Sequence, residues 1–244
     1  MPAIHNPKPT TRPPLVCIFC GATKDISEEH IFSKWMRKYL PHTNFHHHHS
    51  RVMPGPNIPG KSHVKNYRGG TNVIRPKVVC RKCNNGWMSI IETNAKECLI
   101  PLMTGGSFTV TDDHKLKLSR WATLKTMVYE YQTEDFPLVS STEDREKFRK
   151  DITPGDRWGV WIGRCQAPEW RARTMMQAYR LRPVDVEVPK IRNVETFTIA
   201  LNELLIHIRL NKQSAVPLPH VPGGLLQVWP VSSAITWPPP WILD

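Results

Sequence analysis

The chain has 244 residues, of which 40% are hydrophobic and 22% charged, so its composition is that of a folded globular protein. Its 23 prolines argue against a mostly helical bundle. No apolar stretch approaches the roughly 20 residues of a membrane helix, and the first residues lack the apolar core of a secretory signal. We therefore expect a cytoplasmic protein with no membrane partner.

The charge is unevenly distributed along the sequence. The formal net charge is +12, and residues 1–100 hold 15 Lys and Arg against 5 Asp and Glu, whereas residues 101–244 hold 18 against 16. A basic front half suggests a polyanionic partner, with nucleic acid as the leading candidate. The near-neutral back half argues against a second nucleic-acid-binding surface there. The alternative is a generically basic protein with no such partner.

The front half alternates between short ordered segments and proline-rich ones. Residues 1–14 are proline-rich and predict an extended arm. Helical spacing over 32–40 ends at Pro41, and the proline- and glycine-rich residues 41–70 predict a loop insert. Residues 73–80 alternate like a strand, and a helix is expected over 85–98.

The back half predicts a long helix followed by strands. Residues 113–132 have a broad apolar face, and Asp112 or Asp113 is expected to cap this helix. Five apolar segments separated by Gly, Pro and Asn then predict an antiparallel sheet: 157–164, 173–181, 196–201, 204–210 and 225–231. The fold class is therefore α+β, with an N-terminal unit at 15–98 and a helix-plus-sheet domain of unknown role at 99–244.

Four of the six cysteines form two Cys-x-x-Cys pairs, Cys17/Cys20 and Cys80/Cys83. Without an export signal, disulfides are the weaker interpretation. Two such pairs are the usual ligand set of a structural, tetrahedral Zn²⁺ site. The other two, Cys98 and Cys165, lie in apolar surroundings and are expected to be buried free thiols.

A Glu29-His30-Ile31-Phe32 segment lies between the two cysteine pairs, and Asn84 follows the second pair directly. With Gly69-Gly70-Thr71-Asn72 between them, this order resembles the HNH endonuclease family, whose zinc-containing members carry a ββα-metal unit. The resemblance covers about residues 15–97. It implies metal-dependent hydrolysis of phosphodiester bonds in DNA.

The resemblance also implies roles for individual residues. His30 matches the general base, Glu29 and Asn84 match the ligands of a catalytic Mg²⁺ or Mn²⁺, and Asn72 matches the residue that orients the catalytic loop. The acidic position is commonly Asp rather than Glu, and Asn72 lies further from the second cysteine pair than is usual. Seven cations near the site are candidate phosphate contacts: Lys61, Lys65, Arg68, Arg75, Lys77, Arg81 and Lys82.

Several alternatives remain open from the residues alone. Glu29 and His30 fit the first turn of an ordinary helix capped by Ser27, Asn85 is a second candidate for the metal ligand, and Glu28 fits a solvated surface acid. An RNA-directed nuclease with the same site and a non-catalytic zinc module are the alternative functions. A controlling protein partner, or a second copy of the chain bound through the C-terminal domain, is also open.

Overall fold

We describe the protein from a computed structural model. The described residues are 15–40, 46–52, 63–69, 73–132, 138–168, 171–181, 192–213, 223–231 and 235–240. Asn72 and Lys61 lie outside them. None of the helices in this part of the chain is long and apolar enough to cross a membrane. The structure mixes helices with mainly antiparallel sheet, in agreement with an α+β fold.

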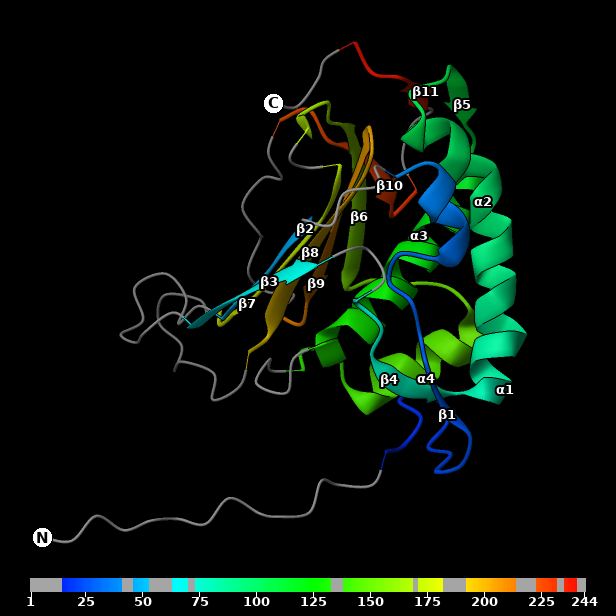
Figure 1. Cartoon of the computed structure of the whole chain (residues 1–244), viewed down its shortest axis with the longest axis vertical. Helices are drawn as coiled ribbons and strands as arrows, with labels where there is room; N and C mark the ends of the chain where they lie inside the picture. The colour runs from blue at the N-terminus through cyan, green and yellow to red at the C-terminus, as the bar shows by residue number, and fades with distance from the viewer. Residues whose placement is uncertain are drawn as a thin grey trace, which may run out of the picture.

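A seven-stranded sheet forms the centre of the molecule, with the strand order β10-β6-β9-β8-β7-β2-β3 (Figure 1). Its neighbours are antiparallel except for the parallel pair β2–β7. The strands expected in the back half are present as β6 (Trp158–Arg164), β7 (Ala172–Tyr179), β8 (Val194–Leu201), β9 (Leu204–Asn211) and β10 (Leu226–Trp229).

The insert at 41–70, expected to be a loop, contributes two strands to this sheet. They are β2 (His46–Val52) and β3 (His63–Gly69), and β2 pairs with β7 from the back half of the sequence. Their sequences show little apolar alternation, so these strands are defined by the backbone pairing of β2 with β3 and β7, which local periodicity does not reveal. Segments far apart in the sequence therefore share one sheet.

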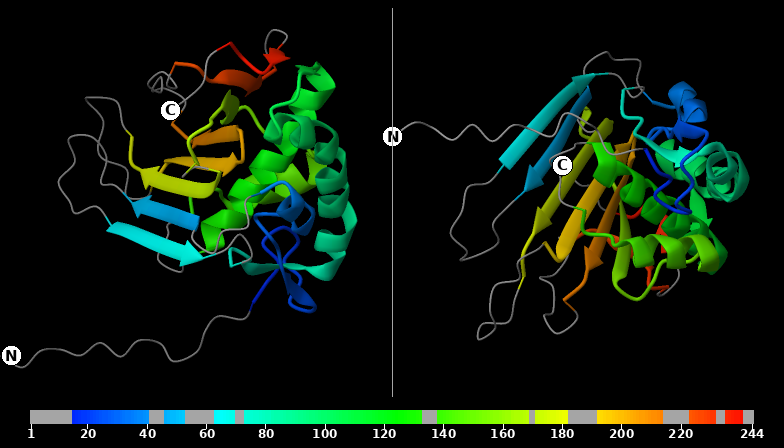
Figure 2. Two further views of the ribbon diagram at one scale, coloured as in Figure 1. Left: turned by 45° about the horizontal axis from the view of Figure 1, so that its top comes forward. Right: turned by 90° about the horizontal axis from the view of Figure 1, so that it is seen from below.

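Helices cover one face of the sheet (Figures 1 and 2). The central one is α3 (Asp112–Tyr129), which begins at the capping box of Thr111, not at Asp112 or Asp113 as expected. Its Tyr129 ring lies 4.6 Å from that of Phe197 on β8, and the Tyr129 hydroxyl accepts a hydrogen bond from Thr174 on β7. These contacts identify the face of the sheet that carries the core.

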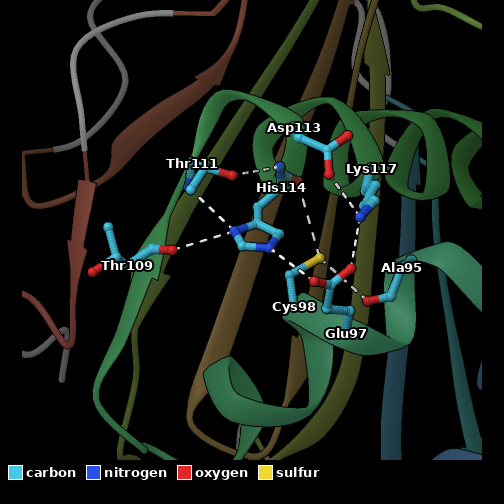
Figure 3. Close-up of polar contacts among 8 residues, drawn as sticks. All are labelled: Ala95, Glu97, Cys98, Thr109, Thr111, Asp113, His114 and Lys117. Atoms are coloured by element: carbon cyan, nitrogen blue, oxygen red, sulfur yellow. Dashed lines mark hydrogen bonds and ion pairs between the residues drawn. The ribbon is translucent and has the colours of Figure 1, made fainter.

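A polar network joins α2 (Ser89–Met103) to the start of α3 (Figure 3). Lys117 pairs with Glu97 at 2.6 Å and with Asp113 at 2.7 Å, and His114 Nε2 lies 3.3 Å from Glu97. Beneath it, the Cys98 thiol is buried and donates to the Ala95 carbonyl, and burial raises the pKa of Cys98 to about 12. Cys98 and Cys165 are both buried free thiols, as predicted.

The smaller described elements include a 3-10 helix over Lys34–Lys38, within the helical segment expected at 32–40. The helix α4 (Thr142–Asp151) was not predicted, and it packs Phe148 against Trp87 with ring centroids 6.1 Å apart. A short pair joins β5 (Phe108–Val110) to β11 (Ile235–Trp237). A second pair joins β1 (Ile26–Glu28) to β4 (Lys77–Cys80), and this pair carries the candidate site.

Candidate metal centre and candidate active site

Four cysteines form a compact cluster at one end of the β1–β4 pair. The Sγ atoms of Cys17, Cys20, Cys80 and Cys83 all lie within 4.8 Å of one another, and Cys20 and Cys80 are 3.6 Å apart. Tetrahedral Zn²⁺ with bonds of about 2.3 Å separates its sulfur ligands by roughly 3.8 Å. All four thiols are free. The cluster therefore has the donor set and spacing to hold a zinc ion.

Local backbone structure presents these thiols. In the first pair, Cys17 donates from its amide to Ala22 O and accepts at its carbonyl from Gly21 N, and Gly21 has a φ of +71° that other residues rarely adopt. In the second, Cys80 ends β4 and its sulfur accepts from the Cys83 amide at 3.4 Å. A hydrogen bond from Ile18 N to Val78 O joins the first turn to β4.

The strand β1 leads directly into the Glu29-His30 segment. Glu29 N donates to Pro76 O at 3.0 Å and Ile31 N to Ile74 O at 3.1 Å, so the segment continues the strand pairing. The first turn of a helix, one of the alternatives from sequence, is therefore excluded. Alternation buries Glu29 and Ile31, whereas Glu28 is exposed and His30 partly exposed.

The helical segment after β4 begins with α1 (Arg81–Cys83), passes through a turn over 84–88 that is kinked at the non-helical Gly86, and continues into α2. Asn84 lies at the start of that turn, and its Nδ2 donates to Ser27 Oγ and to Glu28 O, both at 3.1 Å. These bonds hold Asn84 against the end of β1, two residues before His30, and they use only the Nδ2 atom of the side chain. Asn85 is exposed.

The Glu29 carboxylate forms an ion pair with a buried lysine. Lys125 of α3 lies 2.5 Å from Glu29 Oε1 and 3.0 Å from Glu92 Oε2, and it donates to His30 O at 2.7 Å. Burial alone would lower the pKa of Lys125, but the carboxylates of Glu29 and Glu92 raise it above its usual value, so the ammonium stays charged. Glu92 also accepts from the indole of Trp35 at 2.7 Å.

Sequence reasoning missed this ion pair, although a signal was present. Lys125 falls on the apolar stripe of α3, where an unpaired charge would be costly. Glu29 therefore faces the core. Its role as a metal ligand stays a prediction, and a metal ion would have to compete with Lys125 for the Glu29 carboxylate. The exposed acid Glu28 is on the His30 side of the strand and lies 3.3 Å from Arg75.

We expect Lys125→Met to lower the free energy of unfolding by about 3–5 kcal/mol, because it leaves two buried carboxylates without a cation. The matched control is Lys117→Met on the same helix, which also loses two carboxylate partners, but these partners, Glu97 and Asp113, are exposed, so the change should cost less than about 1 kcal/mol. Urea unfolding measures both, and equal losses would show that burial adds nothing to the Lys125 contacts.

The environment of His30 favours the neutral imidazole. Burial, followed by the positive charge of Lys34, lowers its pKa below the usual value, although Glu29 acts in the opposite direction. A neutral ring nitrogen can accept a proton from water near pH 7. The side chain is only partly buried, so solvent reaches it.

The predicted phosphate contacts fall into two groups. One group is exposed and lies on or close in sequence to the β1–β4 pair: Arg75, Lys77, Arg81 and Lys82. Lys65 and Arg68 belong to β3, where only the backbone is described. The described cations thus surround the strand pair that carries His30.

Comparison of the chain with family models, with curated proteins and with solved structures finds no match.

Proposed function

We propose that this protein is a metal-dependent nuclease that hydrolyses phosphodiester bonds in DNA through an HNH-like site. The observation that carries the proposal is topological. β1 pairs antiparallel with β4, although β2 and β3 lie between them in the sequence, and the helical segment from Arg81 follows β4 directly. His30 lies just beyond β1, and Asn84 lies in the first turns of that helical segment. The cysteine cluster lies where the second strand meets that helix.

His30 is the proposed general base, which takes a proton from the attacking water at a ring nitrogen. Two contacts position it: Lys125 holds its backbone carbonyl, and Asn84 holds the carbonyl of Glu28. A bound Mg²⁺ or Mn²⁺ would polarise the phosphate and offset charge on the leaving 3′ oxygen. Oxygen donors suit such an ion, whereas the four thiols suit Zn²⁺, so the two metals have separate sites.

Asn84 and an acid are the proposed ligands of the catalytic ion. Glu29 is the acid that the family resemblance assigns. Glu28 is a second candidate, because it is exposed on the side of the strand that His30 occupies, whereas Glu29 already pairs with Lys125. Glu28 can exchange its exposed partner Arg75 for a metal ion more readily than Glu29 can exchange the buried Lys125.

The experiment that tests this function is incubation of the zinc-loaded protein with supercoiled plasmid and with a structured RNA, each with Mg²⁺ or Mn²⁺. We expect plasmid nicking or linearisation that requires the divalent ion, with 5′-phosphate and 3′-hydroxyl ends. Cleavage of RNA alone would favour the RNA-directed nuclease. Cleavage of neither, under any divalent ion, would contradict the proposal and favour a non-catalytic zinc module.

A further inference from the structure

A short basic helix follows His30 in the chain. It is the 3-10 helix η1 (Lys34–Lys38), which has the sequence Lys-Trp-Met-Arg-Lys and no acid. Its three cations, Lys34, Arg37 and Lys38, are all exposed. Within the described part of the chain, none of these three side chains forms an ion pair or a hydrogen bond. Their charges are therefore available to a partner.

The helix η1 is anchored to the rest of the protein, so its cations are presented on a fixed surface. Met36 is fully buried. The indole of Trp35 donates to the carboxylate of Glu92 on α2 at 2.7 Å, and η1 is the short blue helix beside α2 in Figure 1. A surface that is already ordered loses little conformational entropy when a ligand binds to it.

Two aromatic rings and two lysines extend this surface from η1 onto α2. The rings of Trp35 and Tyr39 lie 6.1 Å apart. The Nζ atom of Lys96 on α2 lies 5.7 Å from the Trp35 ring centroid, and that of Lys38 lies 4.8 Å from the Tyr39 ring centroid. We call the resulting surface the η1 patch, and its four cations are Lys34, Arg37, Lys38 and Lys96.

The acids of the front half do not offset the charge of the η1 patch. Residues 1–100 contain five acids. Four of them pair with cations outside the patch: Glu28, Glu29, Glu92 and Glu97. The fifth, Asp25, precedes β1, whereas η1 follows it, and the Asp25 carbonyl accepts from the amide of Arg81. The patch therefore keeps a positive potential that attracts anions.

The η1 patch is close to the proposed general base. Lys34 follows His30 by four residues, so at most about 14 Å separates their Cα atoms. The five residues of η1 rise by about 2 Å each, so the helix extends over about 10 Å. One strand of a DNA duplex presents a phosphate roughly every 3.4 Å, which places about three phosphates along that length. A nucleic acid bound at His30 can therefore also contact η1.

The composition of the η1 patch fits a nucleic acid as its partner. Cations interleaved with aromatic rings are typical of surfaces that bind a nucleic-acid backbone. Lys and Arg side chains supply only hydrogen-bond donors, and phosphate oxygens only accept. Several cations spread along a helix match the repeated charges of a phosphodiester chain better than they match a single small anion.

We propose that the η1 patch binds the phosphodiester backbone of the nucleic-acid substrate beside the cleavage site. The inference rests on the proposed function in taking nucleic acid as the partner, but it concerns binding and not cleavage. It assigns phosphate contacts to four cations that are distinct from the seven predicted from the sequence.

The test measures binding of the zinc-loaded, full-length protein to a labelled DNA duplex and to a labelled structured RNA. The method is fluorescence anisotropy without added Mg²⁺ or Mn²⁺. Arg37→Gln/Lys38→Gln removes two charges from the η1 patch. We expect this variant to weaken binding by at least about tenfold at about 0.1 M salt and to reduce the log–log salt slope by about two, because two phosphate contacts are lost.

The matched control is Arg149→Gln/Lys150→Gln. This pair is also an Arg followed by a Lys, both exposed and in the last turn of a helix. However, α4 carries four acids that offset its cations: Glu143, Asp144, Glu146 and Asp151. The control should therefore change affinity less than about twofold.

A second variant separates charge from folding. Arg37→Lys/Lys38→Arg keeps both charges and should bind within about twofold of the wild type. Thermal unfolding of each variant identifies any loss of folding.

Equal effects of the two charge-removing variants, or a wild type that binds neither nucleic acid, would overturn the inference. A labelled polyglutamate chain that binds the patch as tightly as DNA would overturn it in favour of an acidic protein partner. Wild-type cleavage with unchanged binding by the patch variant would overturn it while leaving the proposed function intact. Selective loss of binding in that variant supports it even if no cleavage is observed.

Discussion

His30→Ala should reduce the rate of DNA cleavage by about 10²–10⁴-fold, the usual effect of removing a general base. The His30 side chain is partly exposed, and the hydrogen bonds that hold the segment use backbone atoms of Glu29, His30 and Ile31, so the fold should tolerate the change. Zinc content and DNA affinity should therefore remain near those of the wild type. The measurement is the single-turnover rate of plasmid cleavage, with zinc determined on the same samples.

Variants of the proposed ligands separate the base from the metal site. Asn84→Ala removes an oxygen ligand, so its rate should recover in part as Mn²⁺ is raised, whereas that of His30→Ala should not. Glu28→Gln and Glu29→Gln decide which acid binds the ion, because only the ligand variant should raise the Mn²⁺ concentration needed for half-maximal rate. Asn72→Ala should have the smallest effect. Wild-type cleavage by His30→Ala would contradict the assignment of the base and the HNH-like site with it.

Local patterns in the sequence predicted much of the fold. The two Cys-x-x-Cys pairs indicated a joint site because each pair needs only a tight turn, and the four thiols do converge. The β-rich segments from 157 onward and the long helix α3 were also predicted, because strong periodicity accompanies burial against a core. α4 was missed because only Arg145 and Phe148 are buried in it, although the Ser141–Asp144 capping box is visible in the sequence.

The remaining features depend on contacts between residues far apart in the sequence. The pairing of β2 with β7 joins residues more than a hundred positions apart, and no local pattern in the histidine-rich β2 indicates it. The Lys125–Glu29 contact likewise spans 96 positions, so the inward orientation of Glu29 could not be read from Glu28-Glu29-His30. The sequence shows that Glu28, Glu29 and His30 are adjacent. The register of the strand pairing decides which of their side chains faces the core.

We propose that the cysteine cluster binds one structural zinc ion per chain, and Cys80→Ser is expected to lose it. The change removes a ligand at the point where β4 becomes α1, and it also removes the sulfur that accepts from the Cys83 amide. Apparent zinc-binding energies of structural sites are about 10–16 kcal/mol at pH 7, so loss of the metal should unfold this part of the chain. Zinc content by mass spectrometry and thermal unfolding with and without a chelator measure the effect.

Cys98→Ser is the matched control, because Cys98 is also a buried free thiol but lies outside the cluster. It should keep its zinc and lose stability only through replacement of a buried sulfur.

The position of the cluster means that loss of zinc should loosen several elements together. The first cysteine turn bonds to β4 through Ile18 and Val78, and Arg145 of α4 donates to Ile18 O at 3.2 Å, so loosening that turn also disturbs α4. Removal of zinc should therefore expose amides of β1, β4 and α4 to hydrogen exchange while those of β8 and β9 stay protected. Stable, zinc-free protein with wild-type exchange and cleavage would contradict a structural role for the metal.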